Sequence, residues 1–147
     1  MKHIALALAF LALPACAQAQ TTEPQTFPDS AFIYWSDGDS GYIRGIPEPI
    51  HFRIHDMDTP ETGGVGARGG AKCEPERALG YEAKEYAVAL ADGAEITITG
   101  TYGDDRYDRR VIDLSLDGQD YASAIIDAGH GKVWDYDGGQ PKPEWCG

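Results

Sequence analysis

The sequence is poor in basic residues and in cysteine. Lys and Arg number 12 against 24 Asp and Glu, and the formal net charge at pH 7 is −12. An acidic chain repels polyanions at long range, so the composition alone argues against a polyanionic partner. The three cysteines form no CxxC pair, which argues against a catalytic thiol or a cysteine-based metal site.

The sequence also lacks an apolar run long enough to span a membrane, because Ile4–Leu13 is too short. Lys2 precedes this run, and Ala17-Gln18-Ala19 resembles a cleavage site, so residues 1–19 are predicted to be a signal peptide. The protein is then secreted or periplasmic. In an alternative interpretation Cys16 carries a lipid anchor. Removing the signal takes away one lysine, which leaves 11 basic against 24 acidic side chains and a charge of −13.

Cys73 and Cys146 remain after the signal peptide is removed. Both would then lie in an oxidising compartment, where a disulfide is the expected state. The bond would close a long loop and anchor the last residues of the chain.

The length of 147 residues indicates one domain. Residues 20–30 are polar, contain two prolines and are predicted to be a flexible leader, and residues 31–147 form the domain. Alternation and turn residues predict strands at 31–35, 42–44, 50–56, 94–102 and 109–116. A helix is predicted from Pro75 to just before Gly93, and a short one at 120–128.

The predicted element order is β-β-β-α-β-β-α, an α+β fold that is mainly β. Five short strands with a helix between the third and fourth, and a short helix after the fifth, are typical of an OB-type barrel. Barrels of this kind bind oligonucleotides and oligosaccharides on one face.

The stretch Phe52–Glu61 joins a strand to a charged turn. Alternation places Phe52 and Ile54 on one face and Arg53 on the other. Pro60 ends the strand because it lacks a backbone donor. The stretch therefore holds a guanidinium and several carboxylates at a rigid corner.

Carboxylates also occur in an earlier turn, at Asp37 and Asp39. A meander of antiparallel strands brings this turn to the same end of the sheet as Asp58 and Glu61. Hard carboxylate oxygens on rigid turns suit Ca²⁺ or Mg²⁺.

Two arginines supply a complementary chemistry. The planar guanidinium groups of Arg53 and Arg109 can each grip a phosphate through two hydrogen bonds and stabilise charge in a transition state. A cation, two arginines and one free carboxylate that accepts a proton from water are together sufficient for phosphodiester hydrolysis.

Three motifs in order resemble the staphylococcal nuclease-like, or thermonuclease, family of OB-fold nucleases. They are Asp37-Gly38-Asp39-Ser40, Phe52-Arg53 through Asp58-Thr59-Pro60-Glu61, and Asp105-Arg106-Tyr107-Asp108-Arg109. The spacing of five residues between Arg53 and Asp58 is that of the family, and the resemblance covers about residues 31–133.

The resemblance implies a role for each matching residue. Asp39 and Asp58 correspond to the family's calcium-binding carboxylates, and Thr59 to its backbone-carbonyl ligand. Arg53 and Arg109 correspond to the phosphate-binding arginines and, together with the proposed general base Glu61, would form the catalytic set. Tyr107 matches a tyrosine that lines the nucleotide pocket.

The sequence departs from the family pattern at several positions. Ser40 replaces a threonine, and Asp108 stands where a glycine usually precedes the arginine, which adds a negative charge beside a phosphate site. Residues 133–147 show no counterpart of the family's long last helix.

The sequence thus predicts a monomeric, secreted, Ca²⁺-dependent nuclease that hydrolyses DNA or RNA and has no stable protein partner. One alternative is a non-catalytic OB module that binds calcium, nucleic acid or a glycan. Another, favoured by the net charge, is an enzyme for short or mononucleotide diesters.

Overall fold

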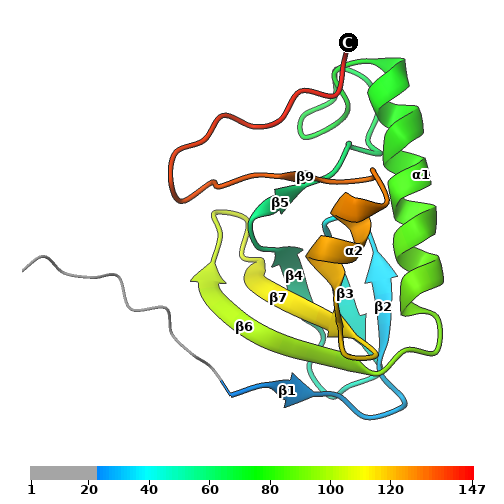
Figure 1. Ribbon diagram of the computed structural model, residues 1–147, viewed down its shortest axis with the longest axis vertical. Helices are drawn as coiled ribbons and strands as arrows, with labels where there is room; N and C mark the ends of the chain where they lie inside the picture. Colours follow the sequence, from blue (N-terminus) through cyan, green and yellow to red (C-terminus); the bar gives the residue numbers. More distant parts are fainter. Residues whose placement is uncertain (1–22) are drawn as a thin grey trace, which may run out of the picture.

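A computed structural model describes residues 23–147, and the predicted signal peptide with Cys16 lies outside the described residues. Two helices and two sheets make up this part of the chain (Figure 1). The strands are β1 (Gln25–Thr26), β2 (Phe32–Trp35), β3 (Ser40–Arg44), β4 (Ile50–Ile54), β5 (Met57–Asp58), β6 (Ile96–Asp104), β7 (Arg110–Leu116), β8 (Gln119–Asp120) and β9 (Lys132–Val133). The helices are α1 (Glu74–Ala91) and α2 (Tyr121–Asp127). Neither of them is long and apolar enough to cross a lipid bilayer.

The main sheet is mixed and has the strand order β1-β6-β7-β4-β3-β2, with β8 paired to β7. Its neighbours are antiparallel except β4 and β7, which run parallel with Phe52 opposite Arg110. Parallel strands need a long crossover, and here α1 and β6 provide it. The parallel pair brings the loop before β7 alongside β4. The small second sheet joins β5 to β9.

The sheet is open, so the prediction of a closed five-stranded OB-type barrel with a helix between strands three and four is wrong. Closure would require β2 and β6 to pair. Instead β1 occupies the outer edge of β6, with Thr26 opposite Thr97, and β2 remains at the far edge, where α1 packs beside it. The segment predicted as a flexible leader thus contributes a strand, and Phe27 is buried in the core.

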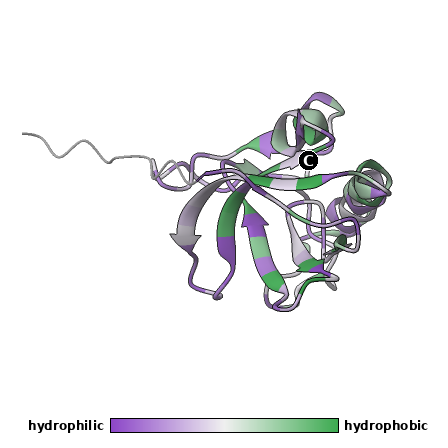
Figure 2. Ribbon diagram, turned by 90° about the horizontal axis from the view of Figure 1, so that it is seen from below, coloured by the Kyte–Doolittle hydropathy of each residue, from purple (hydrophilic) through white to green (hydrophobic). Residues whose placement is uncertain are grey.

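The core lies between the sheet and the helices. Phe52 and Ile54 are buried and Arg53 is turned away from them, which confirms the alternation predicted for this strand. Trp35 stacks on Tyr121 of α2 at a centroid distance of 4.7 Å and meets Phe52 edge-on. Figure 2 shows green and purple bands alternating along a strand of the sheet, as expected for a period of two.

α1 begins where the sequence predicts. Cys73 is its N-cap and accepts a hydrogen bond from the Glu76 amide, and a proline follows in the first turn. Gly93 lies just beyond the end with a φ of 67°, as expected for a C-terminal glycine. The helical spacing of Leu79, Ala83, Tyr86, Ala87 and Leu90 predicts one apolar face, but Leu79 is 38% exposed. The buried residues of α1 are instead short or acidic: Glu76, Gly80, Ala83 and Ala87.

Gly80 allows α1 to approach the turn that follows β5. A Cβ atom at this position would lie 2.4 Å from the carbonyl oxygen of Glu61 and 2.9 Å from that of Pro60. Backbone atoms cannot move aside as a flexible side chain can. The helix therefore fixes the backbone of Glu61 through direct contact.

We expect Gly80→Ala to lower the free energy of unfolding by about 2 kcal/mol, because overpacking against the Glu61 carbonyl outweighs the gain of up to about 1 kcal/mol in helix propensity. Urea denaturation would measure the change. Ala78→Gly, at an exposed position of the same helix, is the matched control and should lose only about 1 kcal/mol. A Gly80→Ala protein that is more stable than the wild type would contradict the close packing.

Candidate functional site

The turn between β2 and β3 is ordered by its own first carboxylate. Oδ1 of Asp37 accepts hydrogen bonds from the amides of Asp39 and Ser40 and from the Ser40 hydroxyl, at 2.8 to 3.0 Å. This is the local bonding by which aspartate stabilises turns. Burial, and then the charges of Asp39 and Glu61, raise the pKa of Asp37 well above its ordinary value.

Asp39 joins this turn to the one after β5. Its Oδ2 accepts a hydrogen bond from the Thr59 amide at 3.1 Å, and its carbonyl accepts one from the Ile54 amide at 2.8 Å. Gly38 packs against the same threonine, since a Cβ there would lie 2.8 Å from its methyl group. Two motifs that are about twenty residues apart in the sequence thus form one corner.

Arg53 lies between the two aspartates predicted to bind a cation. One of its terminal nitrogens is 3.6 Å from Oδ2 of Asp39 and 3.9 Å from Oδ1 of Asp58, and it donates a hydrogen bond to the Met57 carbonyl. The ring of Trp134 lies 4.8 Å from the guanidinium carbon. The structure therefore brings Asp39, Arg53 and Asp58 together.

Asp58 is fully buried. Its Oδ2 accepts a hydrogen bond from the Trp145 indole at 2.8 Å, but its Oδ1 has no hydrogen-bond partner, and neither has Oγ1 of Thr59 beside it. Burial and then the charge of Asp39 raise the pKa of Asp58 to about 6, although Trp145, Lys142 and Arg53 act in the opposite direction. The positive charges of Arg53 and Lys142 near this carboxylate therefore only partly offset its burial.

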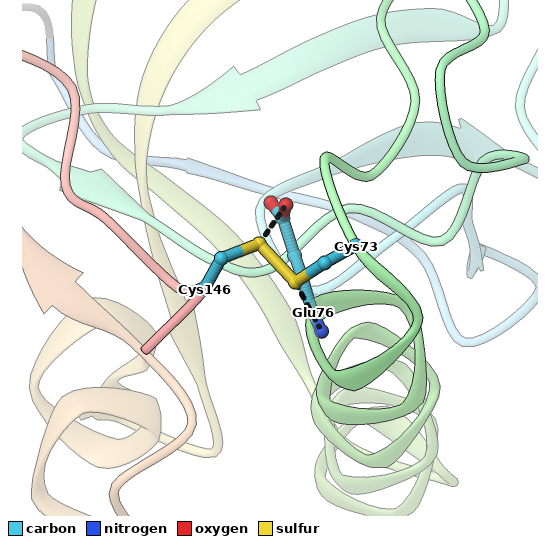
Figure 3. A group of neighbouring side chains, drawn as sticks. All are labelled: Cys73, Glu76 and Cys146. Carbon is cyan, nitrogen blue, oxygen red and sulfur yellow. Dashed lines mark hydrogen bonds between the residues drawn. A yellow bond between two sulfur atoms is a disulfide. The ribbon is translucent and has the colours of Figure 1, made fainter.

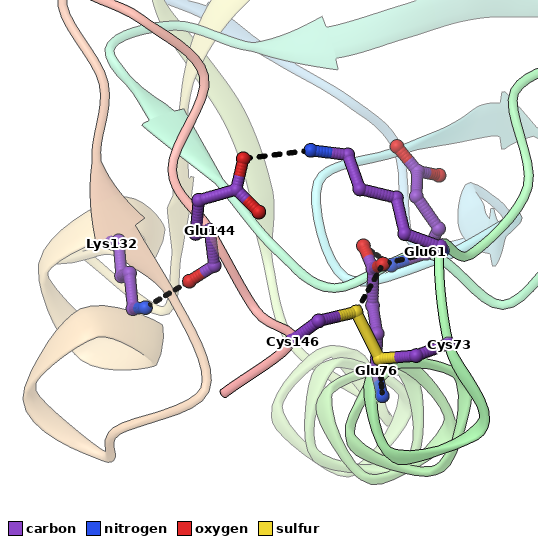
Figure 4. The surroundings of a disulfide bond; sticks show 7 residues. Glu61, Cys73, Glu76, Lys132, Glu144 and Cys146 are labelled. Atoms are coloured by element: carbon purple, nitrogen blue, oxygen red, sulfur yellow. Dashed lines mark hydrogen bonds and ion pairs between the residues drawn. A yellow bond between two sulfur atoms is a disulfide. The ribbon is translucent and has the colours of Figure 1, made fainter.

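Lys142 links Glu61 to Asp58. The ammonium group of Lys142 lies 2.6 Å from Oε1 of Glu61 and 3.5 Å from Oδ1 of Asp58. The backbone amide of Glu61 is held at the start of α1 by the Glu76 carboxylate, which also accepts a hydrogen bond from the Lys72 amide (Figure 4). The predicted base is therefore next to the predicted cation ligands, with a lysine between them.

Arg109 is held apart from this cluster. Within residues 23–147 its ion pair is with Asp105, at 2.7 Å, and Asp105 also accepts hydrogen bonds from Nε and the amide of the arginine. Burial opposes ionisation of Asp105, but these bonds outweigh it and lower its pKa. Arg109 precedes Arg110, the register partner of Phe52, and lies two residues before Val111, the partner of Arg53. This offset corresponds to about 7 Å along the strand.

The loop that carries Arg109 contains a residue in the left-handed region. Asp108 has a φ of 57°, a conformation that favours glycine and that aspartate tolerates better than most residues. A glycine would adopt this conformation without strain. Tyr107, predicted to line a nucleotide pocket, is 53% exposed, and its ring lies 5.2 Å from the guanidinium carbon of Arg109.

The sequence interpretation missed the contribution of residues 134–147, which we name the strap. Trp134, Lys142 and Trp145 in the strap contact Arg53, Glu61 and Asp58, as described above. The sequence did indicate that the strap lies near the site. The predicted disulfide joins the end of the strap to the residue before α1, close to the turn that holds Glu61.

The disulfide between Cys73 and Cys146 is confirmed, with an S–S distance of 2.06 Å (Figure 3). Both cysteines are half-buried, and Oε2 of Glu76 lies 3.7 Å from the Cys146 sulfur. These three side chains are close enough to hold a metal ion. In the oxidised state, however, neither sulfur is a thiolate, so we interpret the group as structural.

The two aspartates that the sequence predicts to bind a cation, Asp39 and Asp58, both lie near the guanidinium group of Arg53. Their carboxylates offer oxygen donors, and Oδ1 of Asp58 accepts no hydrogen bond although Arg53 and Lys142 lie 3.9 and 3.5 Å from it. Oxygen ligands of this kind are those that Ca²⁺ binds, and a positive charge here would relieve the repulsion between the two carboxylates.

Comparison with known proteins adds no family. No protein-family model matches the chain, and a search of the curated proteins finds no significant match. The similarity to the thermonuclease family remains a prediction from the three motifs.

The raised pKa of Asp58 predicts a pH dependence of stability. The folded chain binds a proton at this group more tightly than the unfolded chain, so stability falls as the pH rises from about 4 to about 6 and the loss is complete above that range. A shift of about two units corresponds to roughly 3 kcal/mol. We expect Asp58→Asn to be more stable than the wild type at pH 7.5, by up to that amount, and the difference to vanish near pH 4.

Urea denaturation at both pH values, with a chelator present, measures this difference. Asp105→Asn is the matched control, because the pKa of Asp105 is lowered. This variant should be less stable than the wild type at pH 7.5 and approach it as the pH falls below about 4. A difference for Asp58→Asn that does not depend on pH would show that burial does not oppose its ionisation.

Proposed function

We propose that the protein is a Ca²⁺-dependent phosphodiesterase that hydrolyses DNA or RNA. The observation that carries the proposal is the convergence of Asp39, Arg53, Asp58 and Glu61 at one corner of the fold. These side chains come from the turn before β3, from β4 and β5, and from the turn after β5. Charged residues whose only role is solubility lie apart on the exposed surface, whereas ionisable groups clustered in a buried corner are typical of functional sites.

The arginines would bind the phosphate. Arg53 is largely buried, and in the described structure its interactions with Asp39 and Asp58 are long, at 3.6 and 3.9 Å, so its hydrogen-bonding capacity is not used up by them. Arg109 is oriented by Asp105. A guanidinium group on β4 and another in the loop just before β7, the strand that pairs with β4, can hold separate oxygens of one phosphate and stabilise the charge that develops on it.

Glu61 would act as the general base. It takes a proton from a water molecule while the water oxygen forms a bond to phosphorus and the bond to the leaving oxygen breaks. The leaving oxygen takes up a proton from solvent water, and Glu61 then returns its proton to the solvent, which completes the hydrolysis. A base is effective only at a fixed position, and the contacts of the Glu61 backbone with Gly80 and Glu76 provide one.

A divalent cation would be held by Asp39, Asp58 and the backbone carbonyl of Thr59. When bound, it supplies positive charge next to the phosphate and lowers the cost of bringing an anion to a cluster of carboxylates. Lys142 and Arg53 alone carry two positive charges against the charges of Asp37, Asp39, Asp58 and Glu61.

A second candidate function is a non-catalytic binding module. The observation that favours it is the position of Lys142, whose ammonium group already contacts both Glu61 and Asp58. A lysine there would neutralise the corner permanently and leave the two arginines to bind a phosphate without cleaving it. Hydrolysis that depends on Glu61 separates the two functions.

We expect Glu61→Gln to reduce turnover roughly 100- to 10,000-fold and Arg109→Ala roughly 100- to 1,000-fold, because one removes the base and the other removes transition-state charge. Cleavage of single-stranded DNA and RNA would be followed with Ca²⁺ and with chelator, for the oxidised and the dithiol-reduced protein.

Two exposed residues provide matched controls for these variants. Glu48→Gln and Arg110→Ala repeat the same chemical changes at exposed positions and should keep turnover within about twofold. Absence of hydrolysis in every condition would exclude the enzyme. Unchanged turnover in Glu61→Gln alone would remove the assignment of the base.

We also expect Asp108→Gly to lower KM roughly fivefold, because it removes a negative charge beside the phosphate-binding arginine and places glycine in a left-handed conformation. Asp117→Gly, at a φ of 51° in another turn, makes the same change of charge and backbone elsewhere and should leave KM unchanged. Equal effects of the two substitutions would mean that only overall charge matters.

A further inference from the structure

The strap, residues 134–147, covers the candidate site at three points. It follows β9, where Lys132 is opposite Asp58, and Figure 1 shows it turning back to end beside the start of α1. Trp134 lies over Arg53, and the Trp145 indole donates its hydrogen bond to Asp58. The strap contains no helix or strand and contributes nothing to the buried apolar core.

Lys142 brings a positive charge to the carboxylates of the corner. Its ammonium group lies 2.6 Å from Oε1 of Glu61 and 3.5 Å from Oδ1 of Asp58. The fit is incomplete, since Oδ1 of Asp58 accepts no hydrogen bond from it. An ammonium group at this place competes with a divalent cation for the same oxygens.

The strap is held in place mainly by its far end. The disulfide joins Cys146 to Cys73, and Glu144 accepts bonds from Lys72 and Lys132 at 2.9 and 2.6 Å (Figure 4). The pair between Lys72 and Glu144 is exposed on both sides, and such pairs contribute little. The covalent bond is thus the strongest restraint, and it keeps Lys142 at a high effective concentration near the carboxylates.

We propose that the strap is an autoinhibitory element that excludes cation and substrate from the corner, and that reduction of the Cys73–Cys146 disulfide by a dithiol releases it. The part concerning substrate rests on the proposed function, and the part concerning the cation does not. In the reduction the S–S bond breaks, two electrons and two protons pass from the dithiol to the cysteines, and the dithiol becomes a disulfide.

Calorimetric titration with Ca²⁺ alone tests the proposal on the full chain. We expect oxidised Lys142→Ala and dithiol-reduced wild type each to bind Ca²⁺ at least tenfold more tightly than the oxidised wild type. Lys84→Ala is the matched control, because this substitution removes the same charge without touching the strap. Lys84 lies on α1, and its ammonium nitrogen is 5.9 Å from the centre of the Tyr34 ring. The affinity of this variant should stay within twofold of the wild type.

Hydrogen exchange of residues 134–147 gives a second measurement that needs no ligand. The strap amides should exchange faster in the reduced protein and in Cys73→Ser/Cys146→Ser. That double variant should also no longer respond to dithiol. If it fails to fold, as circular dichroism would show, reduction of the wild type and Lys142→Ala still test the proposal.

The results separate this proposal from the proposed function. Tighter Ca²⁺ binding after reduction, without cleavage of DNA or RNA, supports autoinhibition by the strap and refutes the proposed phosphodiesterase activity. Equal rates of hydrolysis by the oxidised protein, the reduced protein and Lys142→Ala refute autoinhibition by the strap and support the proposed phosphodiesterase activity. The autoinhibitory role of the strap is also refuted if Lys142→Ala binds Ca²⁺ no more tightly than Lys84→Ala does. It is refuted as well if no form of the protein binds Ca²⁺.

Discussion

The repulsion between carboxylates at the corner around Asp58 is the constraint on which the rest of the site depends. Asp58 is fully buried and close to Asp39, and both effects oppose its ionisation. Positive charge must therefore reach the corner from elsewhere in the chain. It comes from Arg53 on β4 and from Lys142 at the opposite end of the sequence, at distances from Asp58 that permit attraction but not a short hydrogen bond.

The folded backbone holds these like charges together. Asp39 receives the Thr59 amide, Gly38 lies against the same residue, and Gly80 lets α1 pack directly on the Glu61 carbonyl. None of these contacts depends on a cation. The energy that opposes the repulsion is supplied by packing elsewhere, in the core formed by Trp35 and its apolar neighbours.

Sequence patterns predicted the features that depend on local periodicity or on pairs of residues. Strand β4, the start of α1 and the disulfide followed from alternation, from proline and from cysteine counting. The open sheet did not, because β1 has only two polar residues, and edge pairing leaves no periodic signal. Leu79 and Gly80 both fit a helical period, and only the approach of the Glu61 backbone decides which of them is buried. Lys142 was missed because a single lysine between prolines has no pattern.

The pairing of β4 with β7 has a kinetic consequence. Phe52 meets Arg110, and Gln25 meets Ile98, so the central and outer strand pairs both join residues that are far apart in the chain. Contacts between such distant residues require large loops to close before they return any stability, and folding is correspondingly slow. During synthesis the sheet cannot be completed until β7 has emerged. Arg109, in the loop before β7, is therefore among the last of the predicted site residues to be placed.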